Sequence, residues 1–244
     1  ALSELLCYER SWKKLSWPRR FMKEVALWNK IRKKNYDLII NLTEGDRGIL
    51  AALFSQAAIR VGFEPKGKWQ KKVLTHTVKH CPTPRHTVER NLDAVRRLGI
   101  FPVPEERELF LDVPLKSLAA MQKKVGTDPF VLIHPASRWR FKCWPVEQMR
   151  ELTELLLDQG KRVVFTAGPD PIEQSMVEEI TRNLPVISLA GQLSLKELSA
   201  LIAMSEQLIC VDSVPLHIAS ALKKRVLVLF GPSSDAAWGP WRNP

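Results

Sequence analysis

A short stretch near the carboxyl end of the chain combines a carboxylate, a hydroxyl and an imidazole at the junction of two predicted elements. In ICVDSVPLHIASAL, residues 209–222, an apolar run ends at Asp212 and Ser213, and a helix with Pro215 in its first turn then carries His217. The first turn of a helix has backbone N–H groups without helical partners, and the helix dipole adds partial positive charge there. Such a junction is typical of anion-binding sites.

A second group of polar residues follows the apolar run at residues 130–134. The segment SRWRFKCWP begins at Ser137, and its Arg138 and Lys142 could supply mobile positive charge to a diphosphate. Glycosyl transfer from a sugar nucleotide needs such charge, because bond breaking leaves negative charge on the diphosphate. The alternation of aromatic and basic residues could instead stack on nucleic-acid bases, or form a hydrophobic staple before the next helix.

Each candidate in the first stretch also has an ordinary structural explanation. Ser213 could be only a helix N-cap, and Asp212 only a partner of the first helical turn. His217 could be a hydrogen-bonded histidine of the core. For each of these residues, the structural explanation and the anion-binding explanation both stay open on this stretch alone.

Strand-like and helix-like patterns alternate along most of the chain and would position these residues. Beyond residue 128 we predict strands at 130–134, 162–166, 186–189, 207–211 and 226–230, with helices at 146–158, 173–182, 195–204 and 216–222. Short connections between such elements indicate a parallel sheet with helices on both faces. Ligands bind beyond the carboxyl ends of the strands in such sheets, so the polar residues after each strand should form one cleft.

The first half of the chain shows fewer strands. Its predicted elements are strands at 37–42 and 109–113 and helices at 21–34, 48–58 and 87–98. We expect an amino-terminal domain at 1–114, a linker helix region at 115–128 with its helix at 115–125, and a second domain at 129–244. Because the chain starts without Met, part way through an apparent helix, we expect the first domain to be incomplete, without its opening strand and helix.

The charge of the chain is unevenly distributed. The net charge is +11, of which +9 falls on residues 1–112 and +2 on residues 113–244. The basic first half indicates contact with nucleic acid, anionic lipid or a phosphorylated acceptor, or simply solubility. No apolar run approaches the roughly 18 to 20 residues that cross a bilayer, so we expect a cytoplasmic protein.

Several chemistries lose their usual support in this sequence. Neither a GxGxxG after a strand nor a GxxxxGK[ST] is present, which argues against dinucleotide redox chemistry and P-loop hydrolysis, and we expect no cofactor. The four cysteines are far apart and predict neither disulfides nor a zinc site. His76, His80, Cys81 and His86 have loosely metal-like spacing, but they lack a second ligand pair and prolines intervene, so we expect no metal.

Five segments together resemble the bacterial ADP-heptose:lipopolysaccharide heptosyltransferases of glycosyltransferase family 9. They are SRWRFKCWP, AGPDPIEQ, SLAGQLSLKEL, VDSVPLHIASAL and LFGPSS, in the family's order, with looser similarity in YDLIINLT and HTVERNL. Within the family, the inner-core enzymes are the most similar. The resemblance implies an α/β GT-B glycosyltransferase fold of two Rossmann-like domains with the active site between them. It also implies inverting transfer of heptose from ADP-heptose to the heptose region of the lipopolysaccharide inner core.

The resemblance implies roles for the residues of the two segments described first. Lys142 corresponds to the family's lysine at the phosphates and the transferred sugar, and Asp212 to the acid that faces the sugar; both would be catalytic. Ser213, Val214 and His217 correspond to the helix-start positions around the diphosphate. Asp212 would then hold the sugar while the N–H groups after it hold the phosphates.

Further binding residues follow from the same resemblance. Ser137 corresponds to a hydroxyl at the phosphate, Glu173 lies about where the family's acid meets the ribose, and Leu193 falls in the segment whose backbone contacts adenine. On the acceptor side, Arg90 and Arg47 are the candidates for contacting lipopolysaccharide.

One family feature has no counterpart here. The family's catalytic base is an Asp in a glycine-rich loop after the first strand of the amino-terminal domain, and no position matches it. We therefore expect the chain to begin beyond that loop, and to bind donor with little transfer. The expected partners are ADP-heptose, the inner-core acceptor and, peripherally, an anionic membrane surface, without nucleic acid. The alternatives are another GT-B sugar-nucleotide enzyme and a basic nucleic-acid-binding module, whose affinity would fall steeply with salt.

Overall fold

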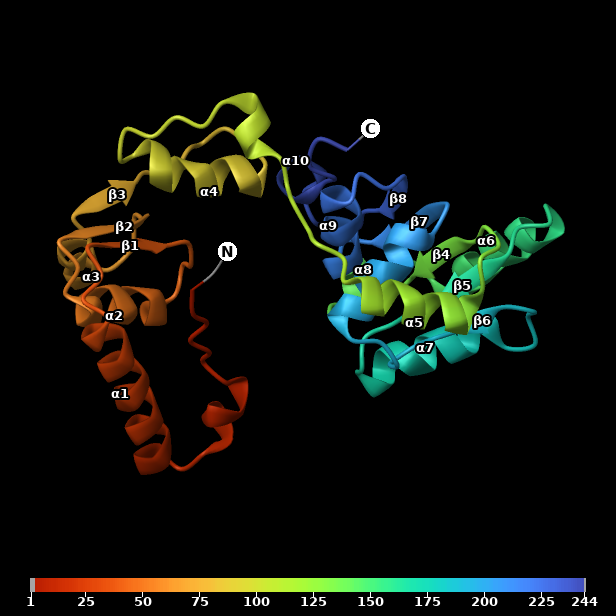
Figure 1. The fold of residues 1–244 in the computed structure, drawn as a ribbon, viewed down its shortest axis with the longest axis horizontal. Helices are drawn as coiled ribbons and strands as arrows, with labels where there is room; N and C mark the ends of the chain where they lie inside the picture. Colours follow the sequence, from red (N-terminus) through yellow and green to blue (C-terminus); the bar gives the residue numbers. More distant parts are fainter. Residues whose placement is uncertain (1–2, 244) are drawn as a thin grey trace. The chain divides into compact units, whose positions relative to one another are not determined.

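The chain folds into two compact units in the computed structural model, which describes residues 3–243 without the side chain of Arg10 (Figure 1). The first unit comprises residues 1–83 and 89–102, and the second comprises residues 84–88 and 103–244. Among the helices of residues 3–243, none combines the length and the apolar character needed to cross a bilayer.

The first unit is built on a three-stranded parallel sheet in the order β1-β2-β3. The strands are β1 (Leu38–Asn41), β2 (Ile59–Phe63) and β3 (His76–Val78). The helices are η1 (Arg10–Lys14), α1 (Trp17–Lys33), α2 (Asp46–Ser55), α3 (Lys68–Val73) and α4 (Thr87–Arg96). Two small apolar clusters stabilise this unit, one around Ile49 and Ala52 and one around Val61 and Ala94.

The second unit is built on a five-stranded parallel sheet in the order β6-β5-β4-β7-β8. The strands are β4 (Val131–His134), β5 (Val163–Phe165), β6 (Ile187–Ser188), β7 (Gln207–Val211) and β8 (Val226–Leu229). The helices are η2 (Pro104–Arg107), α5 (Leu115–Val125), η3 (Arg140–Lys142), α6 (Val146–Asp158), α7 (Pro171–Thr181), α8 (Leu195–Met204), α9 (Val214–Ala221) and α10 (Asp235–Trp238).

Helices cover both faces of the second sheet, as its buried apolar strands require (Figure 1). Leu132 packs in a core with residues of α5, α8 and α9, whereas its neighbours Val131 and Ile133 pack in a core with residues of α6 and α7. Successive side chains of a strand point to opposite faces, so these two cores lie on opposite sides of the sheet. Met121 and Val125 of α5 are fully buried in the first core, so the helix expected in the linker region packs within the second unit.

The order of the strands creates a switch point between β4 and β7. The chain starts at the central strand β4, moves outward to β5 and β6, and returns to continue through β7 and β8. The connections after β4 and β7 therefore lead away from each other, and the carboxyl ends of these two strands are where a sheet of this kind binds ligands.

The structure differs from the sequence-based expectation mainly between residues 59 and 113. The strands β2 and β3 and the helix α3 were not predicted, and the expected strand at 109–113 is wrong. That segment is irregular in the structure, and the side chain of Phe110 is 88% exposed. The segment is therefore not buried along its length, and only its end, at Val113, packs partly against the core of the second unit.

Candidate functional site

The switch point of the second sheet brings together the two residues expected to be catalytic. The chain leaves β4 through Ser137 and enters η3, which carries Lys142, while Asp212 directly follows β7. The Nζ of Lys142 donates a hydrogen bond to Oδ2 of Asp212 over 2.6 Å. The side chain of Asp212 is 6% exposed and that of Lys142 is 21% exposed. A buried carboxylate and a partly accessible ammonium group thus form a close ion pair at the edge of the sheet where folds of this kind bind ligands.

The surroundings keep Asp212 ionised. Burial alone would raise the pKa of Asp212, but the hydrogen bond from Lys142, the neighbouring Ser233 hydroxyl and the positive charge of Lys142 outweigh burial and lower this pKa below its usual value. The site therefore holds a fixed negative charge and a matching positive charge at neutral pH.

The loop that carries Lys142 is held against the exit of β8. A Cβ atom on Gly231 would lie 3.1 Å from the carbonyl oxygen of Phe141 and 3.6 Å from Cα of Lys142, so the close approach depends on glycine. Within the loop, the N–H of Ser137 donates to Sγ of Cys143 over 3.3 Å. The sequence placed Gly231 and Ser233 after the last strand, at the edge of the expected cleft, but it gave neither residue a role in holding the loop or the carboxylate.

The start of α9 offers fewer free N–H groups than the first turn of most helices. Ser213 occupies the N-cap position, but its Oγ donates to the carbonyl of Val211 over 3.2 Å and accepts no hydrogen bond from the helix. Pro215 has no N–H, and the N–H of Leu216 donates to the carbonyl of Ser213 over 3.2 Å. Within residues 3–243, the N–H of Val214 has no acceptor. An anion here would therefore depend on Val214, the helix dipole and Lys142.

His217 lies one turn into α9 and remains close to the charged pair. Burial lowers the pKa of His217, as do the charges of His86 and Lys142, and Asp212 opposes them without reversing the shift. The imidazole is therefore neutral at pH 7. Its ring contacts Trp238 in an edge-on arrangement, with 6.2 Å between the ring centroids.

The remaining donor-side candidates follow β5 and β6 at the same edge of the sheet. Oε2 of Glu173 accepts a hydrogen bond from the N–H of Gly168 over 2.9 Å, so this carboxylate helps to shape the turn after β5. Leu193 lies between β6 and α8, half-buried against the core. The structure thus places Ser137, Glu173 and Leu193 at the exits of three neighbouring strands.

The acceptor-side candidates lie in the first unit. Arg90 forms an ion pair with Glu44 and lies over the ring of Phe63, 4.5 Å from its centroid. Arg47 lies 4.0 Å from the centroid of the Tyr8 ring. Both guanidinium groups are therefore already engaged by neighbours of their own unit.

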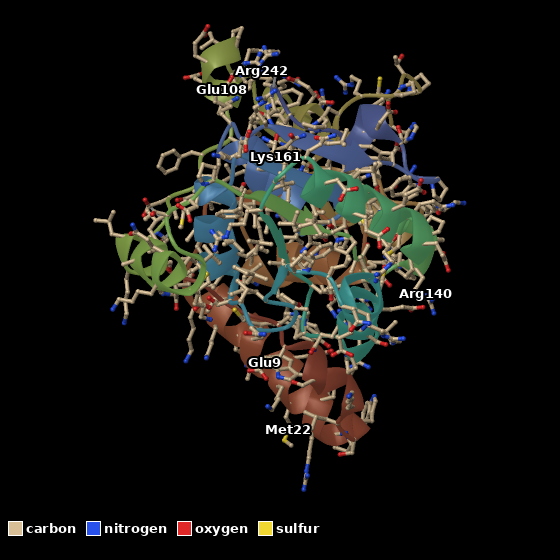
Figure 2. The ribbon with its side chains drawn as sticks, turned by 90° about the vertical axis from the view of Figure 1, so that its right-hand side faces the viewer. Glu9, Met22, Glu108, Arg140, Lys161 and Arg242 are labelled. Carbon is tan, nitrogen blue, oxygen red and sulfur yellow. The ribbon has the colours of Figure 1, made fainter. Side chains whose placement is uncertain are left out.

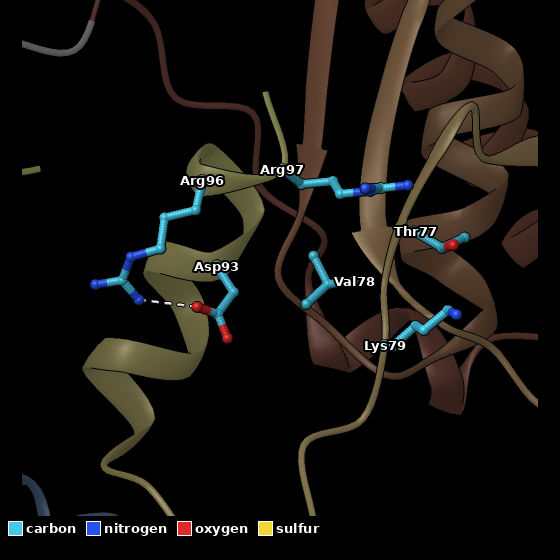
Figure 3. Close-up of a pocket in the computed structure, with 6 residues that line it drawn as sticks. All are labelled: Thr77, Val78, Lys79, Asp93, Arg96 and Arg97. Atoms are coloured by element: carbon cyan, nitrogen blue, oxygen red, sulfur yellow. Dashed lines mark hydrogen bonds and ion pairs between the residues drawn. The ribbon is translucent and has the colours of Figure 1, made fainter. Parts of the chain in front are cut away.

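A hollow of about 480 Å³ lies beside β3 in the same unit (Figure 3). Its lining residues are Thr77, Val78, Lys79, Asp93, Arg96 and Arg97. Arg96 donates to Asp93 over 2.8 Å and also pairs with Glu89, so these charges largely neutralise one another. For the part of the chain that the structure describes, no three His, Cys, Asp or Glu side chains are grouped to hold a metal ion.

The fold and the position of the charged pair define the class of protein. GT-B glycosyltransferases are built from two Rossmann-like units, and a doubly wound parallel sheet accompanied by another α/β unit agrees with that architecture. A glycosyltransferase family 9 structure from Veillonella parvula DSM 2008 superposes with a TM-score of 0.79 at 20% identity, covering 91% of this chain and 66% of that one. The E. coli heptosyltransferase WaaC with ADP superposes with a TM-score of 0.73 at 20% identity, covering 95% and 72%.

The chain belongs to glycosyltransferase family 9 (heptosyltransferase), whose family model matches residues 24–244. It is 34% identical to lipopolysaccharide heptosyltransferase 3 of E. coli K12 over 89% of this chain and 65% of that protein. It is 24% identical to the lipopolysaccharide core heptosyltransferase OpsX of Haemophilus influenzae over 90% of this chain and 64% of that protein. The chain thus spans just under two thirds of these relatives. The family and the α/β GT-B class expected from the sequence are confirmed.

Proposed function

We propose that the protein is an inverting glycosyltransferase that transfers heptose from ADP-heptose to the heptose region of the lipopolysaccharide inner core. The family membership and the similarity to lipopolysaccharide heptosyltransferase 3 support this activity. The observation that carries the proposal is the 2.6 Å contact between Lys142 and Asp212 at the switch point of the second sheet. It puts a cation for the leaving diphosphate next to an acid for the sugar.

In this proposal the two charged residues bind different parts of the donor. The ammonium group of Lys142 neutralises the diphosphate, on which negative charge grows as the glycosidic bond breaks. The N–H of Val214 and the dipole of α9 add to this stabilisation. Asp212 accepts hydrogen bonds from the hydroxyl groups of the sugar, and Ser213 and His217 complete the surroundings of the diphosphate.

The order of the strands gives the direction in which the donor lies. We place adenine beside Leu193 after β6, the ribose near Glu173 after β5, and the phosphates between the exits of β4 and β7, where Ser137 adds its hydroxyl. When Glu173 binds the ribose, its carboxylate must either give up the hydrogen bond from the N–H of Gly168 or accept hydrogen bonds from both groups.

The acceptor side of the proposal rests on charge. Arg90 and Arg47 would bind the anionic lipopolysaccharide core, and the basic first half would hold the protein at the cytoplasmic face of the inner membrane. Among the 244 residues, none matches the motif of the family's catalytic base. We therefore expect these residues to bind the donor and to catalyse little transfer.

The proposal is tested by calorimetric titration of the chain with ADP. We expect ADP to bind, and Lys142→Ala to weaken binding by roughly 10- to 100-fold, as for the loss of a charged hydrogen bond. Lys161→Ala is the matched control, because Lys161 pairs with Glu206 at the amino end of β5, on the opposite edge of the sheet.

Two outcomes would contradict the proposal. Tighter binding of UDP and UDP-sugars than of ADP and ADP-heptose would indicate another GT-B enzyme. Binding of DNA or RNA with a steep salt dependence, in the absence of ADP binding, would indicate a nucleic-acid-binding module.

A further inference from the structure

One partly exposed tryptophan lies beside the proposed donor site. Trp238 ends α10, is 43% exposed, and meets the ring of His217 at an interplanar angle of 61°. The neighbouring Trp241 differs, because it is half-buried and its indole N–H donates to the carbonyl of Arg107 over 2.7 Å. Within residues 3–243, the indole N–H of Trp238 makes no comparable hydrogen bond. A large apolar ring is thus left open to solvent next to a polar site.

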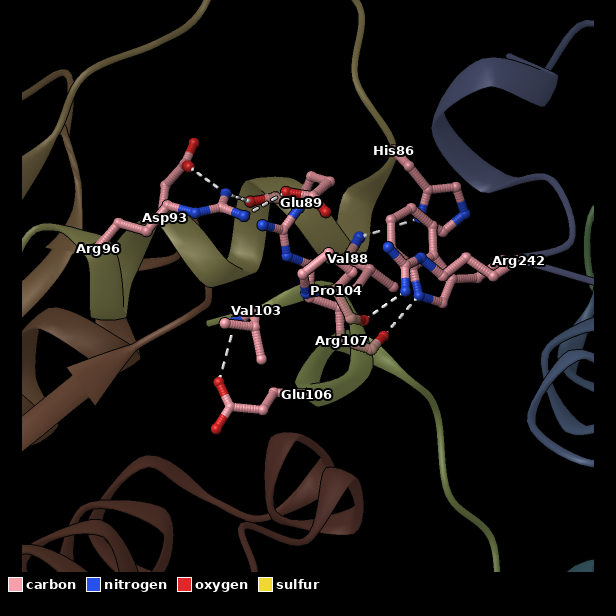
Figure 4. A network of polar contacts seen from close by, with 11 residues as sticks. His86, Val88, Glu89, Asp93, Arg96, Val103, Pro104, Glu106, Arg107 and Arg242 are labelled. Atoms are coloured by element: carbon pink, nitrogen blue, oxygen red, sulfur yellow. Dashed lines mark hydrogen bonds and ion pairs between the residues drawn. The ribbon is translucent and has the colours of Figure 1, made fainter. Parts of the chain in front are cut away.

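The segment around Trp238 is firmly anchored. Ser234 caps α10 by accepting the N–H of Ala237, and the ring Nε2 of His86 lies 2.9 Å from the carbonyl oxygen of Gly239. The ring of His86 also packs on Trp241, with 4.6 Å between the centroids. Its Nδ1 accepts a hydrogen bond from the N–H of Val88 over 3.2 Å (Figure 4). These contacts therefore hold in place the segment that carries Trp238.

The chain beyond Trp238 is anchored as well. The hydroxyl of Ser220 donates to the carbonyl of Trp241 over 3.0 Å. Arg242 pairs with Glu108 over 3.1 Å, and these two side chains lie close together in Figure 2. Lys223 binds the same carboxylate. Contacts on both sides thus hold the backbone that carries Trp238.

The sheet order assigns Trp238 to one end of the donor. In the proposed orientation, adenine lies after β6 and the phosphates lie after β4 and β7. The exit of β8, from which Trp238 follows, is then the end farthest from adenine. Neighbouring strands are about 4.8 Å apart, so β6 and β8 are separated by roughly 19 Å, comparable with an extended sugar nucleotide. The group at this end is the transferred sugar.

We propose that Trp238 is the platform on which the transferred sugar of the donor packs, and that it helps to select that sugar; this inference rests on the proposed function. A pyranose ring has hydroxyl groups around its rim and C–H groups on its faces. Packing one C–H face on an indole removes apolar surface from water, while Asp212 binds hydroxyl groups of the rim. A nucleoside diphosphate without the sugar gains nothing from this contact.

The difference between ADP and ADP-heptose provides the test. Calorimetric titrations of both ligands are compared for the full 244-residue chain, Trp238→Ala, Trp238→Phe and Trp69→Ala. Trp69 is the matched control, because it is a 51% exposed tryptophan of the first unit. We expect Trp238→Ala to weaken ADP-heptose roughly tenfold and ADP less than about twofold. Trp238→Phe retains most of the affinity for ADP-heptose, and Trp69→Ala leaves both affinities unchanged.

The outcomes separate this inference from the proposed function. If the unaltered chain binds neither ligand, the proposed function fails and the platform fails with it. If the unaltered chain binds both ligands and Trp238→Ala changes neither affinity, or weakens both equally, only the platform is overturned. The melting temperature of each variant is measured as well. If Trp238→Ala lowers the affinity for ADP because the variant unfolds, it weakens both ligands alike, and this result counts against the platform.

Discussion

The pair of Lys142 and Asp212 is stable only because each residue compensates the burial of the other. Removing the ammonium group leaves Asp212 as a buried, unpaired charge, which is more costly than losing the pair as a whole. Lys142→Met should therefore lower the free energy of unfolding by about 2 kcal/mol at pH 7, discounted for the partial exposure of Lys142. The double variant Lys142→Met/Asp212→Asn should recover part of this loss.

The pH dependence of this loss has a definite sign. In the unaltered protein the lowered pKa of Asp212 gives stability above its usual pKa, and this stability is lost as the pH falls through the lowered value. In Lys142→Met the same carboxyl group is protonated more readily, so at low pH it no longer carries a buried, unpaired charge. Urea denaturation at pH 7 and pH 4 should show that the two proteins differ less in their free energy of unfolding at pH 4. The same difference at both pH values would contradict the account.

Gly231 acts on the site through the loop that carries Lys142. Gly231→Ala forces the backbone of Phe141 away by a few tenths of an ångström, because the added Cβ would meet its carbonyl oxygen at 3.1 Å. We expect ADP affinity to fall about tenfold with a small change in melting temperature. Gly45→Ala is the control, since a Cβ at Gly45 has nothing within 4 Å. Equal effects of the two substitutions would show that Gly231 does not position Lys142.

At the scale of the elements, the end of β4 holds a buried histidine that makes the second unit sensitive to acid. Burial lowers the pKa of His134 to about 4, and its Nδ1 lies 2.9 Å from Oγ1 of Thr166. Below a pH of about 6.5, the usual pKa of histidine, His134 binds a proton in the unfolded chain but not in the folded chain. Stability should fall by roughly 1.4 kcal/mol per pH unit as the pH drops from 6.5 towards 4.

The role of His134 is tested by scanning calorimetry of the unaltered protein and a variant between pH 6.5 and pH 4. The variant His134→Gln keeps a hydrogen-bonding side chain but does not titrate, so its stability should decline less steeply between pH 6.5 and 4. Identical pH profiles for the two proteins would show that His134 is not the group responsible.

The sequence predicted elements well where apolar pattern and boundary signals agree. The bounds of β7, α5, α6 and α8 are as predicted, and α8 begins with a capping box in which Ser194 and Glu197 exchange hydrogen bonds. The strand β3 was missed because it has three residues, two of them His76 and Thr77. Its strand character comes from pairing with β2, which is a tertiary effect.

The position of the candidate site in the fold could be predicted from the sequence, but the contacts between its residues could not. Parallel topology places the ends of all five strands at one edge, so Lys142 and Asp212 could be expected there from the sequence. The packing of Gly231 on the loop of Lys142 depends on the register between strands, which residue spacing does not encode. The shortage of free N–H groups at α9 follows from Pro215 together with the turn from Leu216 to Ser213.

At the scale of the whole molecule, the excess of positive charge predicts where the protein binds. Residues 1–112 have a net charge of +9. Each basic residue near an anionic bilayer contributes about 1 kcal/mol, an attraction that salt screens. We expect cosedimentation with vesicles containing anionic lipid at low salt, loss of binding at high salt, and no binding to zwitterionic vesicles. Binding to both kinds of vesicle, or to neither, would contradict the predicted membrane contact.

The proposed function and the proposed donor site both depend on where a nucleoside diphosphate binds. A crystal structure of the 244-residue chain with ADP tests this most directly. The account predicts both phosphates at the carboxyl ends of β4 and β7, with the Nζ of Lys142 and the N–H of Val214 within hydrogen-bonding distance. ADP bound at another part of the sheet, or phosphates with Lys142 still turned wholly to Asp212, would contradict it.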